Sequence, residues 1–240
     1  MAEAPSTARD AAILADQVAY YRARAAEYDE WWFRKGRYDR GEALNALWRT
    51  DCDAAESAVE RMLEERRPKN VLELACGTGN FTRHLAPATA RLVAIDASPE
   101  VLGINRVRTA ASNVEYVEAD VFDWRSPERF DLVFFSFWLS HVPTERFAMF
   151  WAQVREQLAP GGSAYLVDSA FDQTSSAKDH VLSDSGIAMR RLNDGREFQI
   201  VKVFYDPQEL NARLARLGWH ATIAPTARYF IHGPASPAAA

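Results

Sequence analysis

The sequence predicts an α/β fold with a doubly wound, mostly parallel sheet, and two observations point to it. Four short apolar runs recur in the first two thirds of the chain, as expected for parallel strands buried on both faces. These runs are Val71 to Ala75, Leu92 to Ile95, Val114 to Val117 and Leu132 to Phe135. Helical segments lie between them, notably Pro99 to Ala111, with Ser98 as N-cap and Pro99 at the first helical position. Strand, helix and strand at this spacing are typical of βαβ units.

A fifth parallel strand is expected after residue 160, and the last strands of the sheet are expected to be antiparallel. The predicted helix Glu145 to Leu158 ends at Pro160-Gly161-Gly162, and the strand Ala164 to Asp168 follows this stop. The last third holds three further predicted elements. They are the apolar alternation Phe198 to Tyr205, a helix Pro207 to Leu217 capped by Asp206, and a final strand near Ala221 to Ile223 or Arg228 to Ile231.

One domain is expected to include all 240 residues, in three parts and a tail. Residues 1–66 should form a helical and aromatic cover, with helices at Thr7 to Tyr28 and Asp51 to Arg66. Residues 67–232 should form the core. Within it, residues 168–199 have no obvious place in the sheet and are a candidate lid, with a solvated insertion as the alternative. Residues 233–240 are expected to fray.

Composition favours a small-molecule ligand in a reducing compartment. With 33 acidic and 28 basic residues, the chain lacks the positive field expected of a nucleic-acid binder. No secretory signal is expected, because Met1 to Gln17 has acidic residues and no apolar block flanked by basic residues. No membrane span is expected either, because the longest apolar run, Leu132 to Leu139, is far too short. Cys52 and Cys76 form no disulfide or metal pattern. We therefore expect a cytoplasmic monomer or homodimer that binds no nucleic acid, membrane or metal.

A small-residue loop follows the first strand and is the strongest local signal. The sequence Glu73-Leu74-Ala75-Cys76-Gly77-Thr78-Gly79 leads from the strand into a helix, where free N–H groups attract polar or negative ligands. A dinucleotide fingerprint would place glycines at the positions of Ala75, Gly77 and Asn80. Only one of the three is glycine, which weakens a nicotinamide interpretation.

Two carboxylates follow the next two strands. Asp96 ends Val93-Ala94-Ile95-Asp96, about 20 residues after the loop, where an acid can accept hydrogen bonds from both ribose hydroxyls. Asp120 lies just after the third strand, beside Val121 and Phe122, and could accept from an adenine amino group. These strand ends predict a site for a nucleoside-shaped ligand at the carboxyl edge of the sheet.

With these motifs the sequence resembles the class I methyltransferases that use S-adenosylmethionine (SAM), in particular the small-molecule branch related to ubiquinone and sugar-amine methyltransferases. The resemblance covers Tyr20 to Ile231. It implies a Rossmann-like seven-stranded sheet with helices on both faces, SAM as cofactor and S-adenosylhomocysteine (SAH) as product. The expected cofactor-binding residues are Tyr21, Tyr28, Glu73, Ala75, Cys76, Gly77, Gly79, Asp96, Ala97, Asp120, Val121 and Ser136. One departure is Ala75, where the family usually has a glycine.

The stretch Ser136 to Val142 follows the fourth strand, which in the family faces the transferred methyl group. His141 is therefore the candidate general base, because a neutral imidazole could take a proton from the acceptor. A purely structural histidine is the alternative. Trp31, Trp32, Phe33 and Tyr38 could line an apolar acceptor pocket or form a packed cover.

The expected function is transfer of the SAM methyl group to an oxygen or nitrogen of a small-molecule acceptor by in-line displacement. Two alternatives stay open: a nicotinamide-dependent oxidoreductase, and a SAM-binding protein without enzymatic activity. A macromolecular acceptor, RNA or protein, is a further possibility, disfavoured for RNA by the acidic balance of the chain.

Overall fold

The computed structural model describes residues 5–182 and 185–238, and its centre is a mixed sheet. The strand order is β3-β2-β1-β4-β5-β10-β8, with β9 added beside β10. The strands are β1 (Asn70–Leu74), β2 (Arg91–Asp96), β3 (Val114–Glu118), β4 (Phe130–Ser136), β5 (Leu158–Ser169), β8 (Trp219–Ala221), β9 (Ala224–Pro225) and β10 (Phe230–Pro237). The first five pair in parallel, and β10 is antiparallel to β5 and β8. The predicted doubly wound sheet with seven strands along its path is confirmed.

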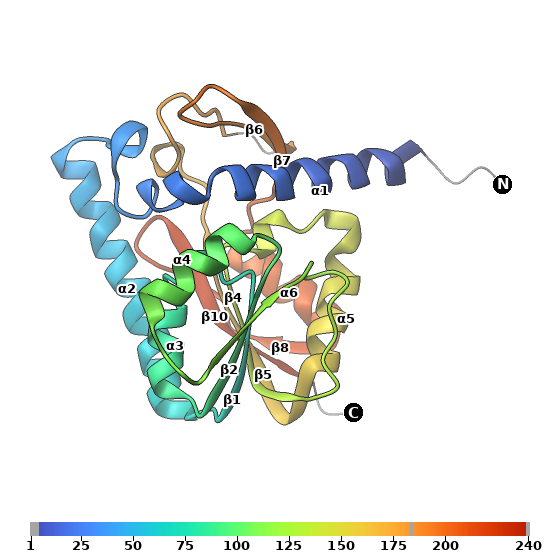
Figure 1. Cartoon of the computed structure of the whole chain (residues 1–240). Helices are drawn as coiled ribbons and strands as arrows, with labels where there is room; N and C mark the ends of the chain where they lie inside the picture. Colours follow the sequence, from blue (N-terminus) through green and yellow to red (C-terminus); the bar gives the residue numbers. More distant parts are fainter. Residues whose placement is uncertain (1–4, 183–184, 239–240) are drawn as a thin grey trace.

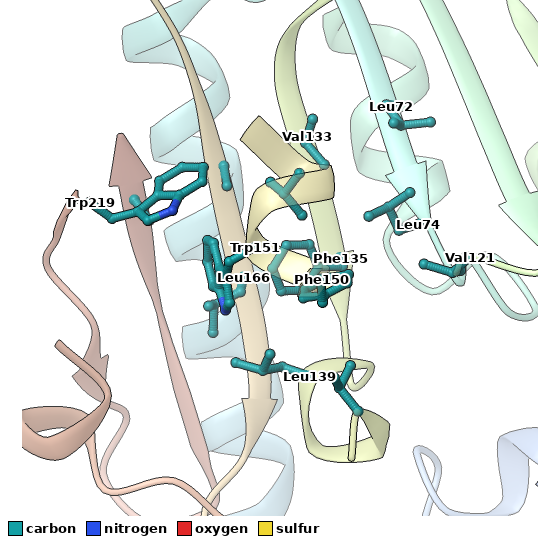
Figure 2. Close-up of a cluster of buried hydrophobic side chains, with 14 of the residues drawn as sticks. Leu72, Leu74, Val121, Val133, Phe135, Leu139, Phe150, Trp151, Leu166 and Trp219 are labelled. Atoms are coloured by element: carbon teal, nitrogen blue, oxygen red, sulfur yellow. The ribbon is translucent and has the colours of Figure 1, made fainter. Parts of the chain in front are cut away.

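Helices cover both faces because successive strand residues point to opposite sides. Phe134 packs in one core with side chains of α2 (Glu42–Arg66) and α3 (Thr82–Ala88). Phe135 packs in another with side chains of α5 (Phe147–Gln157) and α6 (Pro207–Arg216). Figure 2 shows this second core, where the ring of Phe135 lies 5.3 Å from that of Phe150 and 5.8 Å from that of Trp151.

A helical cover lies over the carboxyl ends of the strands. It consists of α1 (Pro5–Ala23) and two 3-10 turns, η1 (Ala25–Glu30) and η2 (Gly36–Tyr38). In Figure 1, α1 runs across the top of the sheet, and a two-stranded hairpin lies above it. This hairpin pairs β6 (Gly186–Arg191) with β7 (Glu197–Lys202). Gln17 of α1 fixes it, because its side-chain oxygen accepts from the Val201 N–H at 3.1 Å.

Several predicted boundaries differ from the structure. β5 already begins at Leu158 and runs through Pro160-Gly161-Gly162, which the sequence predicts as a turn; an irregularity in its pairing with β4 accommodates this segment. The apolar alternation at residues 198–205 forms β7 of the separate hairpin and not a strand of the main sheet. The helix expected from Asp51 begins at Glu42, and the helix expected from Glu145 begins as a 3-10 turn, η4 (Thr144–Arg146), before α5.

The end of the chain is more ordered than expected. Strands lie near both candidate positions, but with shifted bounds, because β8 ends at Ala221 and β10 begins at Phe230. The expectation that residues 233–240 fray is wrong for residues 233–237, which β10 includes; residues 239–240 lie outside the described part. Ala235 explains the order, since it pairs with Ala164 and Ala221 and is 1% exposed. In the described ranges, no helix is long and apolar enough to cross a membrane.

α4 (Pro99–Thr109) joins β2 to β3 and follows the prediction closely. The Ser98 side chain accepts from the Val101 N–H at 3.3 Å, and Pro99 occupies the first turn. The helix therefore starts directly after the carboxyl end of β2. This places its first residues beside the loop that follows β1.

Candidate functional site

A pocket of about 730 Å³ lies where the carboxyl ends of β1, β2 and β4 meet the underside of α1; we call it the strand-end pocket. The loop after β1 forms part of its wall. Ala75 and Gly77 adopt left-handed backbone with φ of +51° and +53°, so the chain turns sharply there. Nine of the twelve residues predicted to bind the cofactor line this pocket: Tyr21, Tyr28, Ala75, Gly77, Asp96, Ala97, Asp120, Val121 and Ser136.

Asp96 occupies the centre of this wall at the end of β2. One carboxylate oxygen accepts from the Gly77 N–H at 2.9 Å, and the other accepts from the Ser98 N–H at 3.0 Å. Burial raises the pKa of Asp96 to about 6, against the lowering effect of these hydrogen bonds. The carboxylate is thus rigidly held, and its remaining lone pairs are suited to accept from a vicinal diol.

Asp120 lies in the same pocket, at the turn after β3. One of its carboxylate oxygens accepts from the Phe122 N–H at 2.8 Å, which fixes the turn. The neighbouring Val121 and Phe122 are buried and apolar and also line the pocket. A polar acceptor beside apolar side chains is suited to a heteroaromatic ring that carries an amino group.

Three predicted cofactor residues lie behind the pocket wall. Glu73 is buried, accepts from the Thr82 hydroxyl at 2.7 Å, and has its pKa raised to about 8 by burial. Cys76 packs in a small apolar cluster with Ala94 and Leu102. Gly79 lies against the Asn105 side chain, which leaves no room for a Cβ. These residues hold the loop in shape, and their contact with a cofactor stays a prediction.

Several other residues that line the strand-end pocket are not among those predicted from the sequence. Ser98, Phe122, Phe137 and Trp138 adjoin predicted positions and could have been found by extending each motif by a residue or two. Leu14, Gln17 and Val18 come from α1, a separate element, and no local signal places them there. Their position depends on how α1 crosses the sheet.

A second pocket of about 570 Å³ adjoins the first, and we call it the basic pocket. Tyr21, Tyr28, Phe137 and His141 line both pockets and so form their common wall. Most of the remaining wall is polar or cationic, and the candidate lid, residues 168–199, supplies much of it. Outside the common wall, the polar and charged residues that line the basic pocket are Tyr20, Arg24, Tyr38, Ser169, Ser175, Ser176, His180, Arg190 and Lys202.

The four aromatic residues of the N-terminal segment have different positions. Trp31 and Tyr38 line the basic pocket. Trp32 is buried in the core beside α2, and the ring of Phe33 is about half exposed. Two of these rings therefore line a pocket, as one hypothesis expects, although its wall is largely polar, and one packs in the core; whether this pocket holds an acceptor stays a prediction.

His141 lies in the common wall, on the 3-10 turn η3 (Leu139–His141). Its Nδ1 is 2.7 Å from the Val201 carbonyl oxygen, which can only accept, so Nδ1 carries the proton. Nε2 then accepts from the Tyr21 hydroxyl at 2.7 Å. Burial, together with the nearby Lys202 ammonium, holds the pKa of His141 well below its usual value. The imidazole is therefore neutral.

Residues 5–182 and 185–238 contain no group of three or more His, Cys, Asp or Glu side chains that could hold a metal ion. Asp184, one of the acids in the candidate lid, lies outside the described residues.

Comparisons with known proteins agree with this geometry. Residues 71–162 match the family model of a methyltransferase domain. The chain is 39% identical over 101 residues to the cypemycin N-terminal methyltransferase of a Streptomyces species, a match covering 41% of each protein. It is 32% identical over 152 residues to nodulation protein S of Sinorhizobium fredii, covering 59% of this chain and 69% of that one. The chain spans less than half the length of the first curated relatives it matches.

A solved structure matches almost the whole chain. The complex of DhpI with SAH superposes with a TM-score of 0.77 at 36% identity, and the match covers 95% of this chain and 98% of that chain. A complex of DhpI with SAM and HEP gives a TM-score of 0.76. The expectations of a Rossmann-like fold and of SAM as cofactor are confirmed. This chain belongs to the class I SAM-dependent methyltransferases.

Proposed function

We propose that this protein transfers the methyl group of SAM to an oxygen or nitrogen of a small-molecule acceptor held in the basic pocket. The observation that carries the proposal is the common wall: Tyr21, Tyr28, Phe137 and His141 face both the strand-end pocket and the basic pocket. The two pockets therefore adjoin, so a molecule in one would lie next to a molecule in the other. Methyl transfer requires such an arrangement.

The residues of the strand-end pocket fit the parts of SAM. Asp96 would accept from the ribose hydroxyls, and Asp120 with Val121 would hold the adenine. The tight loop at Ala75 and Gly77, which lines the same pocket, would lie against the methionine arm. When bound, SAM supplies an activated methyl group on its sulfonium. The task of the protein is then to orient the acceptor and exclude water, with proton removal needed only for some acceptors.

The rival functions have less support. A nicotinamide cofactor would favour a glycine where Asn80 stands. A non-enzymatic SAM sensor needs no second pocket, yet the basic pocket adjoins the first and shares four lining residues with it. The net charge of −5 disfavours RNA as the acceptor. The cytoplasmic location, the monomeric or homodimeric state and the role of His141 as general base stay predictions.

Calorimetric titration separates these functions at the level of the cofactor. We expect SAM and SAH to bind and NAD to show no heat of binding. Incubation with methyl-labelled SAM and a panel of small acids, alcohols, phenols and amines should then transfer label to a small molecule. Binding of NAD in place of SAM, or SAM binding without transfer to any class of acceptor, would contradict the proposal.

A further inference from the structure

The basic pocket contains more buried positive charge than the surrounding protein neutralises. Arg24 and Arg190 are 9% and 8% exposed, and both line the pocket. Within the described ranges, neither guanidinium has a carboxylate oxygen within 4.0 Å, and no Asp or Glu lines the pocket. Their partners are backbone carbonyls: Arg24 donates to the Tyr28 oxygen, and Arg190 to the Met189 oxygen.

Lys202 adds a third buried cation that is only weakly compensated. Its ammonium donates to the hydroxyls of Ser140 and Ser169 at 2.9 and 3.2 Å, and lies 4.0 Å from the Asp168 carboxylate. Both oxygens of Asp168 already accept from the backbone N–H groups of Ser140 and Ser169. Burial, together with the nearby guanidinium groups of Arg190 and Arg24, lowers the pKa of Lys202 to about 8 despite the opposing effect of Asp168.

Uncompensated buried cations are costly, and a ligand of opposite charge relieves that cost. A neutral phenol or a protonated amine would leave the charge of this pocket unbalanced. We propose that the acceptor is an oxyanion, with phosphate, phosphonate or carboxylate chemistry, which Arg24, Arg190 and Lys202 bind and present for methylation on oxygen. This inference rests on the proposed function and names the acceptor class for it.

Hydroxyl groups complete a binding site for such a group. Ser176 and Tyr38 line the same pocket, and hydroxyls can donate to anionic oxygens that the cations do not reach. The Arg24 guanidinium lies 4.9 Å from the centroid of the Tyr28 ring and 5.6 Å from that of the Tyr20 ring. These rings limit its freedom, so the cation is positioned before a ligand arrives.

An oxyanion also fits the state of His141. Both ring nitrogens already have partners inside the protein, Val201 and Tyr21. An ionised acceptor needs no general base: a lone pair on its oxygen forms the new O–CH₃ bond, the S–CH₃ bond breaks, and its electrons stay on sulfur. The products are a methyl ester and SAH, and no proton moves. In this scheme His141 positions the Tyr21 ring between the two pockets.

Anion binding can be measured without turnover. The protein saturated with SAH is titrated calorimetrically with inorganic phosphate, methylphosphonate and acetate. We expect at least one of these anions to bind, and the Arg190→Gln and Lys202→Gln variants to weaken its binding by about tenfold or more while SAH affinity is unchanged. Arg91→Gln is the matched control, because Arg91 pairs with Glu115 and Glu128 at the start of β2, far from the pocket.

The pH dependence gives a readout that needs no variant. Anion affinity should fall as the pH rises through about 8, where Lys202 loses its proton. If SAH binds but none of the three anions binds, or if both Gln variants bind them as well as Arg91→Gln does, the inference is wrong and the proposed function survives. If SAH itself does not bind, the proposed function fails as well.

Turnover decides between the acceptor classes. With methyl-labelled SAM, the anionic compounds should become labelled methyl esters, with separate arms for phosphates, phosphonates and carboxylates. Alkali should release the label from the carboxylate esters but not from the monomethyl phosphates or phosphonates. The shape of the pH profile of kcat between about 6 and 8 should be the same for His141→Gln as for the wild-type protein, since the histidine removes no proton. Preferential methylation of neutral phenols or amines, undiminished in Arg190→Gln, would overturn the oxyanion assignment.

Discussion

The sharpest test of the cofactor site is the substitution Asp96→Asn. In the structure, the two carboxylate oxygens of Asp96 accept from the N–H groups of Gly77 and Ser98, and their other lone pairs face the strand-end pocket. Both ribose hydroxyls of SAM could then donate to one ionised group. The asparagine amide has nearly the same shape, but one of its two positions donates instead of accepting.

The expected loss follows from this difference. One charge-assisted hydrogen bond to the ribose disappears and the other becomes neutral, so about 2–3 kcal/mol of binding free energy is lost. Because each 1.4 kcal/mol is a factor of ten, SAH affinity should fall about 30- to 150-fold. The amide must also leave one of the two backbone N–H groups without an acceptor, which costs about 1–3 kcal/mol of stability.

The assay is calorimetric titration with SAH, with urea unfolding to confirm that the variant is folded. Asp131→Asn is the matched control. The Asp131 carboxylate also accepts from two backbone N–H groups, those of Lys69 and Asn70, but it lies at the opposite edge of the sheet. If Asp96→Asn weakened SAH binding no more than Asp131→Asn does, the assignment of Asp96 to the ribose would be wrong.

Three further predictions test the electrostatics and packing around this site. SAH affinity should decrease as the pH falls through about 6, because the raised pKa of Asp96 means that its carboxylate gains a proton there. Calorimetry between about pH 5 and 8 measures this change, and Asp96→Asn should make the affinity independent of pH over that range. Phe135→Ala should lower the free energy of unfolding by about 3–5 kcal/mol in urea titration, while Val107→Ala, at an 82% exposed position, should change it by less than about 0.5 kcal/mol. Gly79→Ala should lower the free energy of unfolding by at least about 1–2 kcal/mol and weaken SAH binding, because the φ of Gly79 is +91° and the new Cβ would lie 2.5 Å from Asn105 Oδ1. The control Gly103→Ala, with open space around the new Cβ, should leave the free energy of unfolding unchanged or raise it.

The sequence predicts the parallel half of the fold well because its signals are local. Each βαβ unit has an apolar strand, a polar or small-residue turn and a helix start, as at Asp96, Ser98 and Pro99. The strand ends also meet in three dimensions by the geometry of parallel sheets alone. For this reason seven of the nine predicted residues that line the strand-end pocket, all but Tyr21 and Tyr28, could be predicted from the strand ends.

The antiparallel half was less predictable because tertiary packing determines it. The tail at residues 233–237 is rich in small residues and proline, yet it is ordered as β10 between β5 and β8. Nothing in its own composition favours a strand; pairing on both sides supplies the hydrogen bonds and burial. Likewise, β7 has the alternation of a core strand, and only the fold places it in a hairpin above α1.

The basic pocket likewise could not be predicted from the sequence, because tertiary packing brings its residues together. Arg24 directly follows α1, Arg190 lies in β6 and Lys202 lies in β7. Arg24 and Arg190 are thus far apart in the sequence. In the sequence each looks like an ordinary charged residue in an acidic protein. Their common burial follows from the hairpin crossing α1, fixed by Gln17 to Val201. The net charge of the whole chain therefore does not determine the field inside one pocket, and here a small acceptor would meet a cationic site inside an anionic molecule.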